Sequence, residues 1–255
     1  QKTFIDVRDG EEYRIIQIGT QLWMAENLRW LPTIDSTIYG SEVEGYEDSL
    51  FYYVHTYEPV GETLEDSLDG ARQSEYFKRF GVFYNFAAAL GGVEPKRDTL
   101  DVTPIQGACP TGWHLPNYAD WQEFVVYTSL QAELKISSTN IWWKLGIELK
   151  SDSDLWEPVE SSGSDVFLET RNSFNFNAIP TGIRSYVKDE ELGHHSWGKG
   201  IVATFWSSYF GNRKHLWHEY SGQVYWKLTY IQDSFTWLYN YPNGTGNAIR
   251  CIKDD

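Results

Sequence analysis

The stretch GACPTGWHLPNYADWQEF, residues 107–124, holds the strongest structural signals in the chain. A cysteine, two prolines and a histidine precede a run in which apolar side chains such as Trp121 recur at helical spacing. Asn117 is a preferred N-cap residue, and Asp120 stands three positions after it, as in sequences that begin helices. The stretch therefore predicts an amphipathic helix over residues 118–134.

The same stretch contains Cys109, and the other cysteine, Cys251, lies close to the end of the chain. Two cysteines are too few for a four-cysteine metal site, and they are too far apart for a CxxC pair. A disulfide, two buried thiols and a redox pair all remain open on this evidence. A disulfide closing so long a loop would stabilise the fold by roughly 4–5 kcal/mol at most. It would persist only in an oxidising compartment.

Strand signals lie towards both ends of the chain. Asp9-Gly10 and Gly19-Thr20 are turn sequences between alternating segments, which predicts a hairpin at the start. From residue 174 onwards, short apolar runs alternate with Gly, Asn, Asp and Ser, as in a meander of antiparallel strands. Two further helices are expected between these regions, one ended by Gly91 and one over 141–150. We expect one α+β domain over the whole chain.

Composition and charge narrow the class of protein. Apolar residues make up 41% of the 255 residues and aromatics 16%, enough for a sizeable core. The formal charge of −15 argues against binding to nucleic acid, whose phosphates need basic surfaces. No apolar run is long enough for a membrane span. Because the chain begins at Gln1 and its one methionine is Met24, we expect that a signal peptide or lipid anchor has been removed.

Seven segments resemble landmarks of the Fibrobacter succinogenes major paralogous domain family and recur in order over nearly the whole chain. They are TFIDVRDGEEYRIIQIGTQLWMAENL (3–28), FGVFYNFAAAL (80–90), CPTGWHLPNYADWQEF (109–124), LKSDSDLW (149–156), FNFNAIPTGIRS (174–185), ATFWSS (203–208) and AIRCIKD (248–254). The resemblance implies a C-type lectin-like fold, distantly similar to formylglycine-generating enzyme domains, with small antiparallel sheets, two main helices and long surface loops. It also implies a Cys109–Cys251 disulfide that ties the last strand to the helix entrance.

Two regions depart from the family pattern and are interpreted as insertions. Residues 31–77 are long and acidic, without a clear period, and are expected to form a surface loop with about one helical turn. Residues 211–223, GNRKHLWHEYSGQ, follow the landmark FWSS. Both insertions fall where lectin-like folds carry variable loops, and loops on a rigid scaffold often carry recognition.

Aromatic side chains near the second insertion are the candidate ligand contacts. Alternation places Phe235, Trp237, Tyr239 and Tyr241 on one strand face, and such a row is more often core than binding surface. The polar insertion makes burial of its own aromatics less necessary, and exposed Trp and Tyr can stack on sugars or anchor protein interfaces. The predicted ligand-binding residues are Trp217, His218, Tyr220, Trp237, Tyr239 and Tyr241.

Catalytic and metal sites are weaker interpretations. A formylglycine-generating activity needs reactive cysteines, whereas the resemblance assigns both cysteines to structural positions. The chain lacks a Gly-x-Ser-x-Gly nucleophile elbow, and no carboxylate pair stands out. His215 and His218 could share a metal only on a helix, and Asp152 with Asp154 could hold calcium. The calcium ligands of sugar-binding C-type lectins are missing. We predict no catalytic residue, no metal site and no cofactor, with calcium the only ion considered.

The sequence therefore predicts a non-catalytic binding protein, secreted or held on a bacterial cell surface after signal-peptide removal. Its expected role is adhesin-like recognition of a glycan or protein ligand through loop aromatics, without nucleic acid and without a membrane span. A protein–protein assembly module of a surface appendage is the alternative, and an enzyme of the formylglycine-generating type is the second. Fold alone does not choose among them.

Overall fold

In the computed structural model of the chain, the described residues are 2–34, 49–55, 63–97, 100–135, 141–161, 164–166, 169–186, 194–215, 218–240 and 245–254. Within these ranges only the backbone is described for residues 153, 159–161, 164–166, 185–186, 194–197, 212–215, 218–221 and 240. The chain is a mixed α/β protein with several small antiparallel sheets and few helices.

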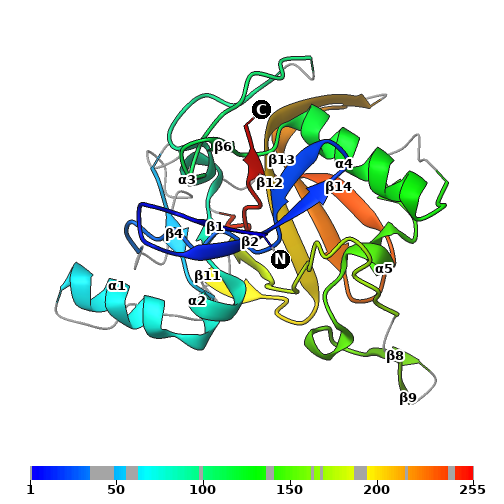
Figure 1. The fold of residues 1–255 in the computed structure, drawn as a ribbon, viewed down its shortest axis with the longest axis horizontal. Helices are drawn as coiled ribbons and strands as arrows, with labels where there is room; N and C mark the ends of the chain where they lie inside the picture. The colour runs from blue at the N-terminus through cyan, green and yellow to red at the C-terminus, as the bar shows by residue number, and fades with distance from the viewer. Residues whose placement is uncertain are drawn as a thin grey trace.

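A five-stranded sheet joins the beginning, the middle and the end of the chain (Figure 1). Its strands, in spatial order, are β1 (Lys2–Ile5), β2 (Glu12–Ile18), β3 (Gln21–Met24), β15 (Ile252–Lys253) and β6 (Trp113–His114). Ile252 of β15 pairs with Trp23 on one side and with His114 on the other. Cys109 and Cys251 form a disulfide with a Cα–Cα distance of 5.9 Å, which confirms the predicted bridge. The predicted hairpin at Asp9-Gly10 is also confirmed.

A four-stranded sheet forms most of the second half of the chain. Its strands, in spatial order, are β12 (Val202–His215), β13 (His218–Thr229), β14 (Phe235–Asn240) and β7 (Ile141–Trp142). The β12–β13 hairpin remains paired as far as His215 opposite His218. The described part of the predicted insertion at 211–223 is therefore the far end of a hairpin, because its residues continue the pairing of the two long strands.

Three two-stranded sheets complete the strand inventory of the described chain. They pair β4 (Tyr52–Tyr53) with β5 (Phe83–Tyr84), β8 (Val159–Ser161) with β9 (Ser164–Val166), and β10 (Ile183–Tyr186) with β11 (His194–Trp197). Single bridges also link Tyr84 to Asn247 and Arg184 to Gly246. The segment before the last strand is thus held against the middle of the chain from two sides.

The helices are α1 (Leu64–Gln73), α2 (Glu75–Phe80), α3 (Phe86–Leu90), α4 (Tyr118–Gln131) and α5 (Leu145–Leu149), with a 3-10 turn at Ser153–Leu155. The predicted helix after Asn117 is confirmed as α4, although it ends at Gln131. The predicted helix before Gly91 is α3, and Gly91 ends it in the left-handed conformation that glycine adopts easily.

Two predictions about local structure were wrong. The expected loop over 31–77 contains α1 and the start of α2. Leu64, Leu68 and Ala71 stand at helical spacing in α1, but the many acidic residues around them favoured the loop interpretation. The expected helix over 141–150 is instead strand β7 followed by the short α5. Ile141 and Trp142 pair with β14, and Lys144 takes a left-handed conformation before α5 begins.

The helix α4 packs between the two larger sheets and forms the centre of one core cluster. Trp121 is fully buried, and its ring centroid lies 4.8 Å from that of Trp23 in β3 and 5.3 Å from that of Trp226 in β13. A second core cluster surrounds the disulfide, with Trp206 of β12 and Phe86 of α3 packed against each other. Strand β12 therefore contributes side chains to both clusters.

Candidate functional site

Four aromatic side chains from three elements meet where α4 begins. They form the aromatic platform, defined here as Tyr118 of α4, Tyr209 of β12, and Trp237 and Tyr239 of β14. Tyr209 is buried, at 8% exposed, whereas Tyr118, Trp237 and Tyr239 are half-buried. The ring centroids of Tyr118 and Tyr209 are 5.3 Å apart, those of Tyr118 and Trp237 are 6.3 Å apart, and those of Trp237 and Tyr239 are 5.3 Å apart. These separations are typical of interacting aromatic pairs.

The platform is the outer end of a row that starts in the core. Phe235, Trp237 and Tyr239 alternate on one face of β14, as the sequence predicted. Phe235 is fully buried against Trp121 of α4, whereas Trp237 and Tyr239 are half-buried. The first residue of α4 is Tyr118, so the row reaches the surface where the covering helix begins.

Gly211 allows the Tyr239 ring to lie across the sheet. A Cβ atom added at Gly211 would come within 2.4 Å of Cε1 of Tyr239, closer than side chains pack. Gly211 pairs with Gly222 of β13, so two adjacent positions of the sheet lack a side chain. Gly211, the first residue of the predicted insertion, thus leaves room for the Tyr239 ring on the sheet.

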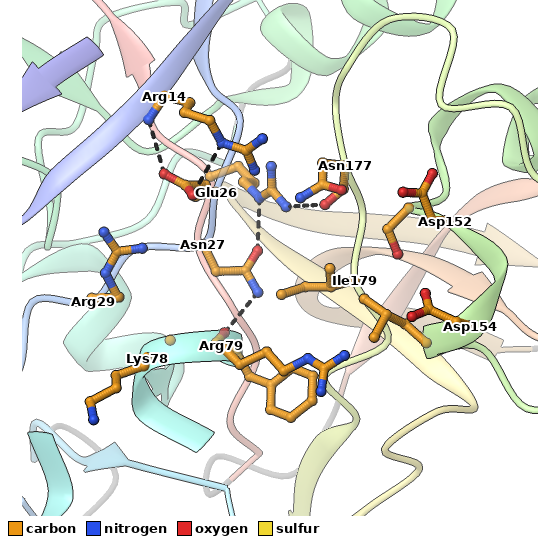
Figure 2. A pocket seen from close by; sticks show the side chains of 15 residues that line it. Arg14, Glu26, Asn27, Arg29, Lys78, Arg79, Asp152, Asp154, Asn177 and Ile179 are labelled. Atoms are coloured by element: carbon orange, nitrogen blue, oxygen red, sulfur yellow. Dashed lines mark hydrogen bonds and ion pairs between the residues drawn. The ribbon is translucent and has the colours of Figure 1, made fainter. Parts of the chain in front are cut away.

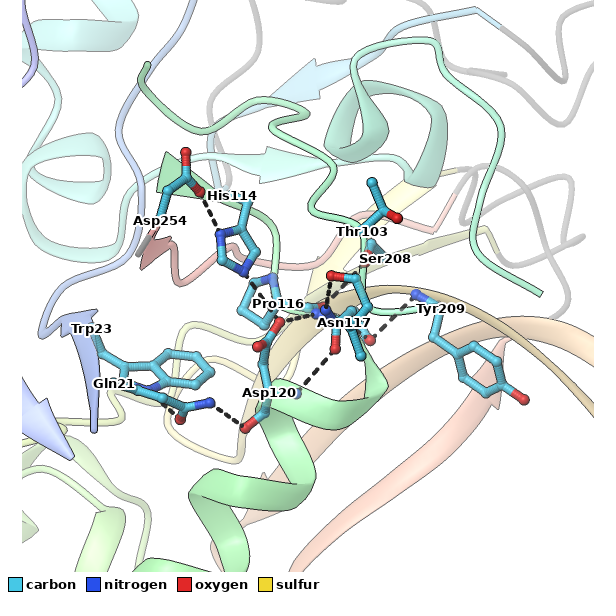
Figure 3. Close-up of polar contacts among 12 residues, drawn as sticks. Gln21, Trp23, Thr103, His114, Pro116, Asn117, Asp120, Ser208, Tyr209 and Asp254 are labelled. Carbon is cyan, nitrogen blue, oxygen red and sulfur yellow. Dashed lines mark hydrogen bonds and ion pairs between the residues drawn. The ribbon is translucent and has the colours of Figure 1, made fainter. Parts of the chain in front are cut away.

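Backbone contacts hold the start of α4 against β12, as Figure 3 shows. The Pro116 carbonyl accepts a hydrogen bond from the Ser208 N–H at 2.9 Å and another from the Ser207 hydroxyl at 3.1 Å. The strand pairing is irregular here, between Trp206 and Phe210. This irregularity and the two serines of the FWSS landmark place Tyr209 next to Tyr118.

A capping box fixes the first turn of α4. The Asn117 side chain accepts from the Asp120 N–H at 3.0 Å, and Asp120 Oδ2 accepts from the Asn117 N–H at 2.8 Å. This reciprocal arrangement satisfies two backbone donors that an isolated helix start leaves unpaired. The predicted N-cap is confirmed, and it fixes the backbone directly before Tyr118, the first residue of α4.

His114 connects this helix start to the end of the chain (Figure 3). Its Nδ1 lies 2.6 Å from Asp254 Oδ1, and its Nε2 lies 3.2 Å from Asp120 Oδ2. Burial of the ring disfavours the charged form, but the hydrogen bonds and charges of Asp120 and Asp254 outweigh it and raise the pKa of His114. Both ring nitrogens of His114 therefore contact carboxylates. The capping box already uses Asp120, so the arrangement is structural.

Of the six predicted ligand-binding residues, the structure describes the side chains of two and only the backbone of two more. It brings Trp237 and Tyr239 together on the platform. His218 and Tyr220 lie in β13, opposite His215 and Arg213, and only their backbone is described. The remaining predicted residues, Trp217 and Tyr241, lie outside the described residues.

Sequence reasoning missed two members of the platform, Tyr118 and Tyr209. Tyr118 stands at the first position of the predicted helix, where a side chain is rarely part of the buried stripe. Tyr209 directly follows the FWSS landmark. Both positions were recognisable, but only the contact between α4 and β12 shows that the two rings meet.

Within the described ranges, no group of three or more His, Cys, Asp or Glu side chains is placed to hold a metal ion. Asp152 and Asp154, the residues considered for calcium, are both exposed. Both cysteines of the chain are in the disulfide. None of the helices in the part of the chain that the structure describes is long and apolar enough to cross a membrane.

The family model of the Fibrobacter succinogenes major domain matches residues 16–253, and the chain therefore belongs to that family. The match covers nearly the whole chain and confirms the resemblance inferred from the sequence landmarks. No curated protein matches the chain significantly, and no solved structure does.

Proposed function

We propose that this member of the Fibrobacter succinogenes major domain family is a non-catalytic, adhesin-like protein that binds a glycan through its aromatic platform. The observation that carries the proposal is the emergence of the β14 aromatic row at the surface, where Trp237 and Tyr239 join Tyr118. Aromatic rings offer flat apolar faces that stack on sugar rings, and their polar edges can form hydrogen bonds.

The geometry favours a preformed binding surface. The rings stand on a helix and two strands whose positions are set by the Asn117–Asp120 capping box and the Pro116–Ser208 contact. Side chains held by such elements lose little conformational freedom when a ligand binds. His218 and Tyr220 lie on the same hairpin, and with Trp217 and Tyr241 they are proposed to extend the platform.

We further propose that the fold is C-type lectin-like. In support, both chain ends lie in one small sheet, a disulfide closes them onto the entrance of the main helix, and a long hairpin projects from the second sheet. An extracellular or cell-surface location is proposed because a structural disulfide persists in oxidising compartments. A lipid anchor is proposed as the means of attachment.

The alternative proposal is a protein–protein assembly module of a surface appendage, since half-buried Trp and Tyr side chains also anchor protein interfaces. The second alternative, an enzyme of the formylglycine-generating type, has less support because both cysteines are bonded to each other. Such an enzyme would need a free thiol and a bound metal.

A glycan array with the purified chain tests the proposal, followed by titration of any glycan that binds. Trp237→Ala is expected to weaken binding by about tenfold or more, the effect of removing a central aromatic contact. Trp143→Ala is the matched control, because Trp143 is 61% exposed and is not part of the platform. Tyr239→Ala is the second variant, in case Trp237→Ala changes the fold.

Equal loss of affinity in Trp143→Ala and Trp237→Ala would contradict a site on the platform. An array without any binding, together with co-purification of one defined surface protein, would support the assembly alternative. A free Cys109 or Cys251 thiol and a stoichiometric transition metal in the purified protein would support the enzyme alternative.

A further inference from the structure

A pocket of about 260 Å³ lies away from the platform, between α2, the end of β3 and the segment that follows α5 (Figure 2). Its lining includes five basic side chains, which are Arg14, Arg29, Lys78, Arg79 and Arg250. It includes three carboxylates, Glu26, Asp152 and Asp154. We call it the cationic pocket. Its volume is below the range of about 300–1,000 Å³ usual for drug-sized ligands, so it suits one small unit.

The lining of this pocket is richer in basic side chains than the chain as a whole. The whole chain carries 21 Lys and Arg against 36 Asp and Glu, whereas basic side chains outnumber acidic ones in the pocket lining. Basic residues gathered in a concave site focus a positive potential there. Ion pairs neutralise three of these basic side chains, so the attraction of the pocket for an anion rests on Arg79 and Arg250.

Three of the basic residues are already paired. Arg14 Nε lies 3.2 Å from Glu26, Arg29 Nε lies 2.6 Å from Glu11, and Lys78 makes an exposed pair with Glu75. Arg79 makes no ion pair with any described residue, and its guanidinium extends toward the segment that carries Asp152 and Asp154 (Figure 2). Arg79 therefore has its charged donors available for a ligand.

Two carboxylates of the pocket also lack an ion-pair partner among the described residues. Asp152 and Asp154 flank the start of the 3-10 turn, are exposed, and form no ion pair within the described ranges. Ionised carboxylates accept hydrogen bonds from hydroxyl groups. The pocket thus presents a free guanidinium on one side and two hydroxyl-accepting carboxylates on the other.

Arg250 supplies a fixed positive charge to the lining. Its side chain is fully buried, and it donates to Asn27 Oδ1 at 2.7 Å, to the Phe176 carbonyl at 2.7 Å and to the Asn177 carbonyl at 2.9 Å. Burial lowers the pKa of Arg250 to about 9, which leaves the side chain charged at neutral pH. Asn27 also donates to the Phe80 carbonyl at 2.9 Å, so the same network holds the end of α2 in place.

We propose that the cationic pocket binds an acidic sugar unit, with Arg79 holding the carboxylate and Asp152 and Asp154 accepting hydrogen bonds from ring hydroxyls. The planar guanidinium of an arginine matches the geometry of a carboxylate. The buried Arg250 in the lining adds a positive potential. This proposal does not depend on the aromatic platform, because the two sites share no residue.

The test is calorimetric titration of the whole chain with sodium glucuronate, at low and high salt, with glucose as the neutral probe. We expect saturable glucuronate binding that weakens with salt, and at least about tenfold weaker binding of glucose. Arg79→Ala is expected to reduce glucuronate affinity by about tenfold, the usual effect of losing one charge-assisted contact. Lys135→Ala, which removes one exposed positive charge elsewhere, is the matched control.

Asp154→Asn separates recognition of the sugar from simple attraction of an anion. It is expected to weaken glucuronate binding, because an amide is a poorer hydroxyl acceptor than a carboxylate, although it removes a negative charge. Methyl glucuronide, whose anomeric oxygen is blocked, is expected to bind as well as glucuronate if the source is a glycan chain end. Binding of glucuronate but not of the methyl glycoside would indicate a free sugar acid.

Three results would overturn the proposal. They are equal binding of glucose and glucuronate, equal effects of Arg79→Ala and Lys135→Ala, and stronger glucuronate binding by Asp154→Asn. Absence of glucuronate binding at millimolar concentration would overturn it as well. Trp237→Ala should leave glucuronate affinity unchanged, so failure here is distinguishable from failure of the platform.

Discussion

The two larger sheets are built in opposite ways. The five-stranded sheet combines β1, β2 and β3 from the start of the chain with β6 from the middle and β15 from the end. The four-stranded sheet takes three of its strands, β12, β13 and β14, from consecutive positions in the sequence. The first closes the fold through distant contacts, whereas the second is assembled locally and adds β7 at its edge.

The comparison indicates that the two sheets have different roles. The five-stranded sheet holds distant parts of the chain together, and the four-stranded sheet presents a surface. The five-stranded sheet is tied by the Cys109–Cys251 bridge and by the buried contacts of Arg250. The β12–β13 hairpin extends past the first residue of α4, so the helix does not cover this end of the sheet. The half-buried Trp237 and Tyr239 lie there. A locally paired hairpin can vary without disturbing the closure, which is how a stable scaffold can carry a changeable recognition surface.

The largest expected effect is a loss of unfolding free energy when the buried contacts of Arg250, near the end of the chain, are removed. Arg250→Met removes the donor to Asn27, to the Phe176 carbonyl and to the Asn177 carbonyl, and leaves these groups without their buried partner. We expect the free energy of unfolding to fall by about 5 kcal/mol, measured by urea denaturation. Lys78→Met, at an exposed ion pair, should change it by less than about 1 kcal/mol. A similar small change in both variants would mean that Arg250 does not hold the chain end.

The disulfide should have the next largest effect. Replacing Cys109 and Cys251 together by serine removes a bridge with a sequence separation of 142 and should reduce stability by about 4 kcal/mol. Urea denaturation of the double variant measures the loss, and the wild-type chain denatured with and without reductant is the control. If the oxidised and reduced wild-type chains unfold at the same urea concentration, the bridge does not stabilise the closure.

Alanine substitutions of Trp226 in β13 and of its neighbour Trp237 in β14 show which of the two belongs to the core. Trp226 is 1% exposed and Trp237 is half-buried, although the two residues are direct partners in the pairing register. Trp226→Ala should cost about 3–5 kcal/mol of unfolding free energy, and Trp237→Ala about 1–2 kcal/mol. Thermal and urea unfolding measure both. An equal loss would place Trp237 in the core and weaken the case for the platform.

The smallest expected effect is a pH dependence at His114. Because the partners Asp120 and Asp254 raise the pKa of His114 in the folded state, its contribution is fully present below the unfolded pKa of about 6.5. The contribution is lost as pH rises through the raised folded pKa. Urea midpoints at pH 6 and pH 8.5 should therefore fall with pH more in the wild-type chain than in His114→Gln. Identical pH slopes in the two proteins would contradict this assignment.

The helix α4 shows how much local sequence can predict. The Asn117 cap, the carboxylate at Asp120 and the apolar spacing after it act within a few residues, so α4 and its capping box were predictable. The same holds for the turns at Asp9-Gly10 and Gly19-Thr20. Helix α1 was missed although Leu64, Leu68 and Ala71 stand at helical spacing, because the acidic composition of the segment was interpreted as a surface loop.

The candidate site was only partly predictable. Alternation on β14 correctly placed Trp237 and Tyr239 on one face with Phe235. It could not show which of them the helix covers, because that depends on where α4 begins relative to the sheet. Tyr118 and Tyr209 are 91 positions apart, and only packing brings their rings together. The cationic pocket combines α2 with residues that follow β3 and α5, and no local pattern signalled it.

The sequence by itself determined the family, the main helix, the first hairpin and, through the resemblance, the bridge between Cys109 and Cys251. These features depend on short-range patterns or on landmarks that recur in order. The tertiary structure alone decided which aromatics stay buried and which basic side chains share a cavity. Burial and electrostatic potential depend on residues that are distant in sequence and close in space, so they are settled only when the sheets and helices pack together.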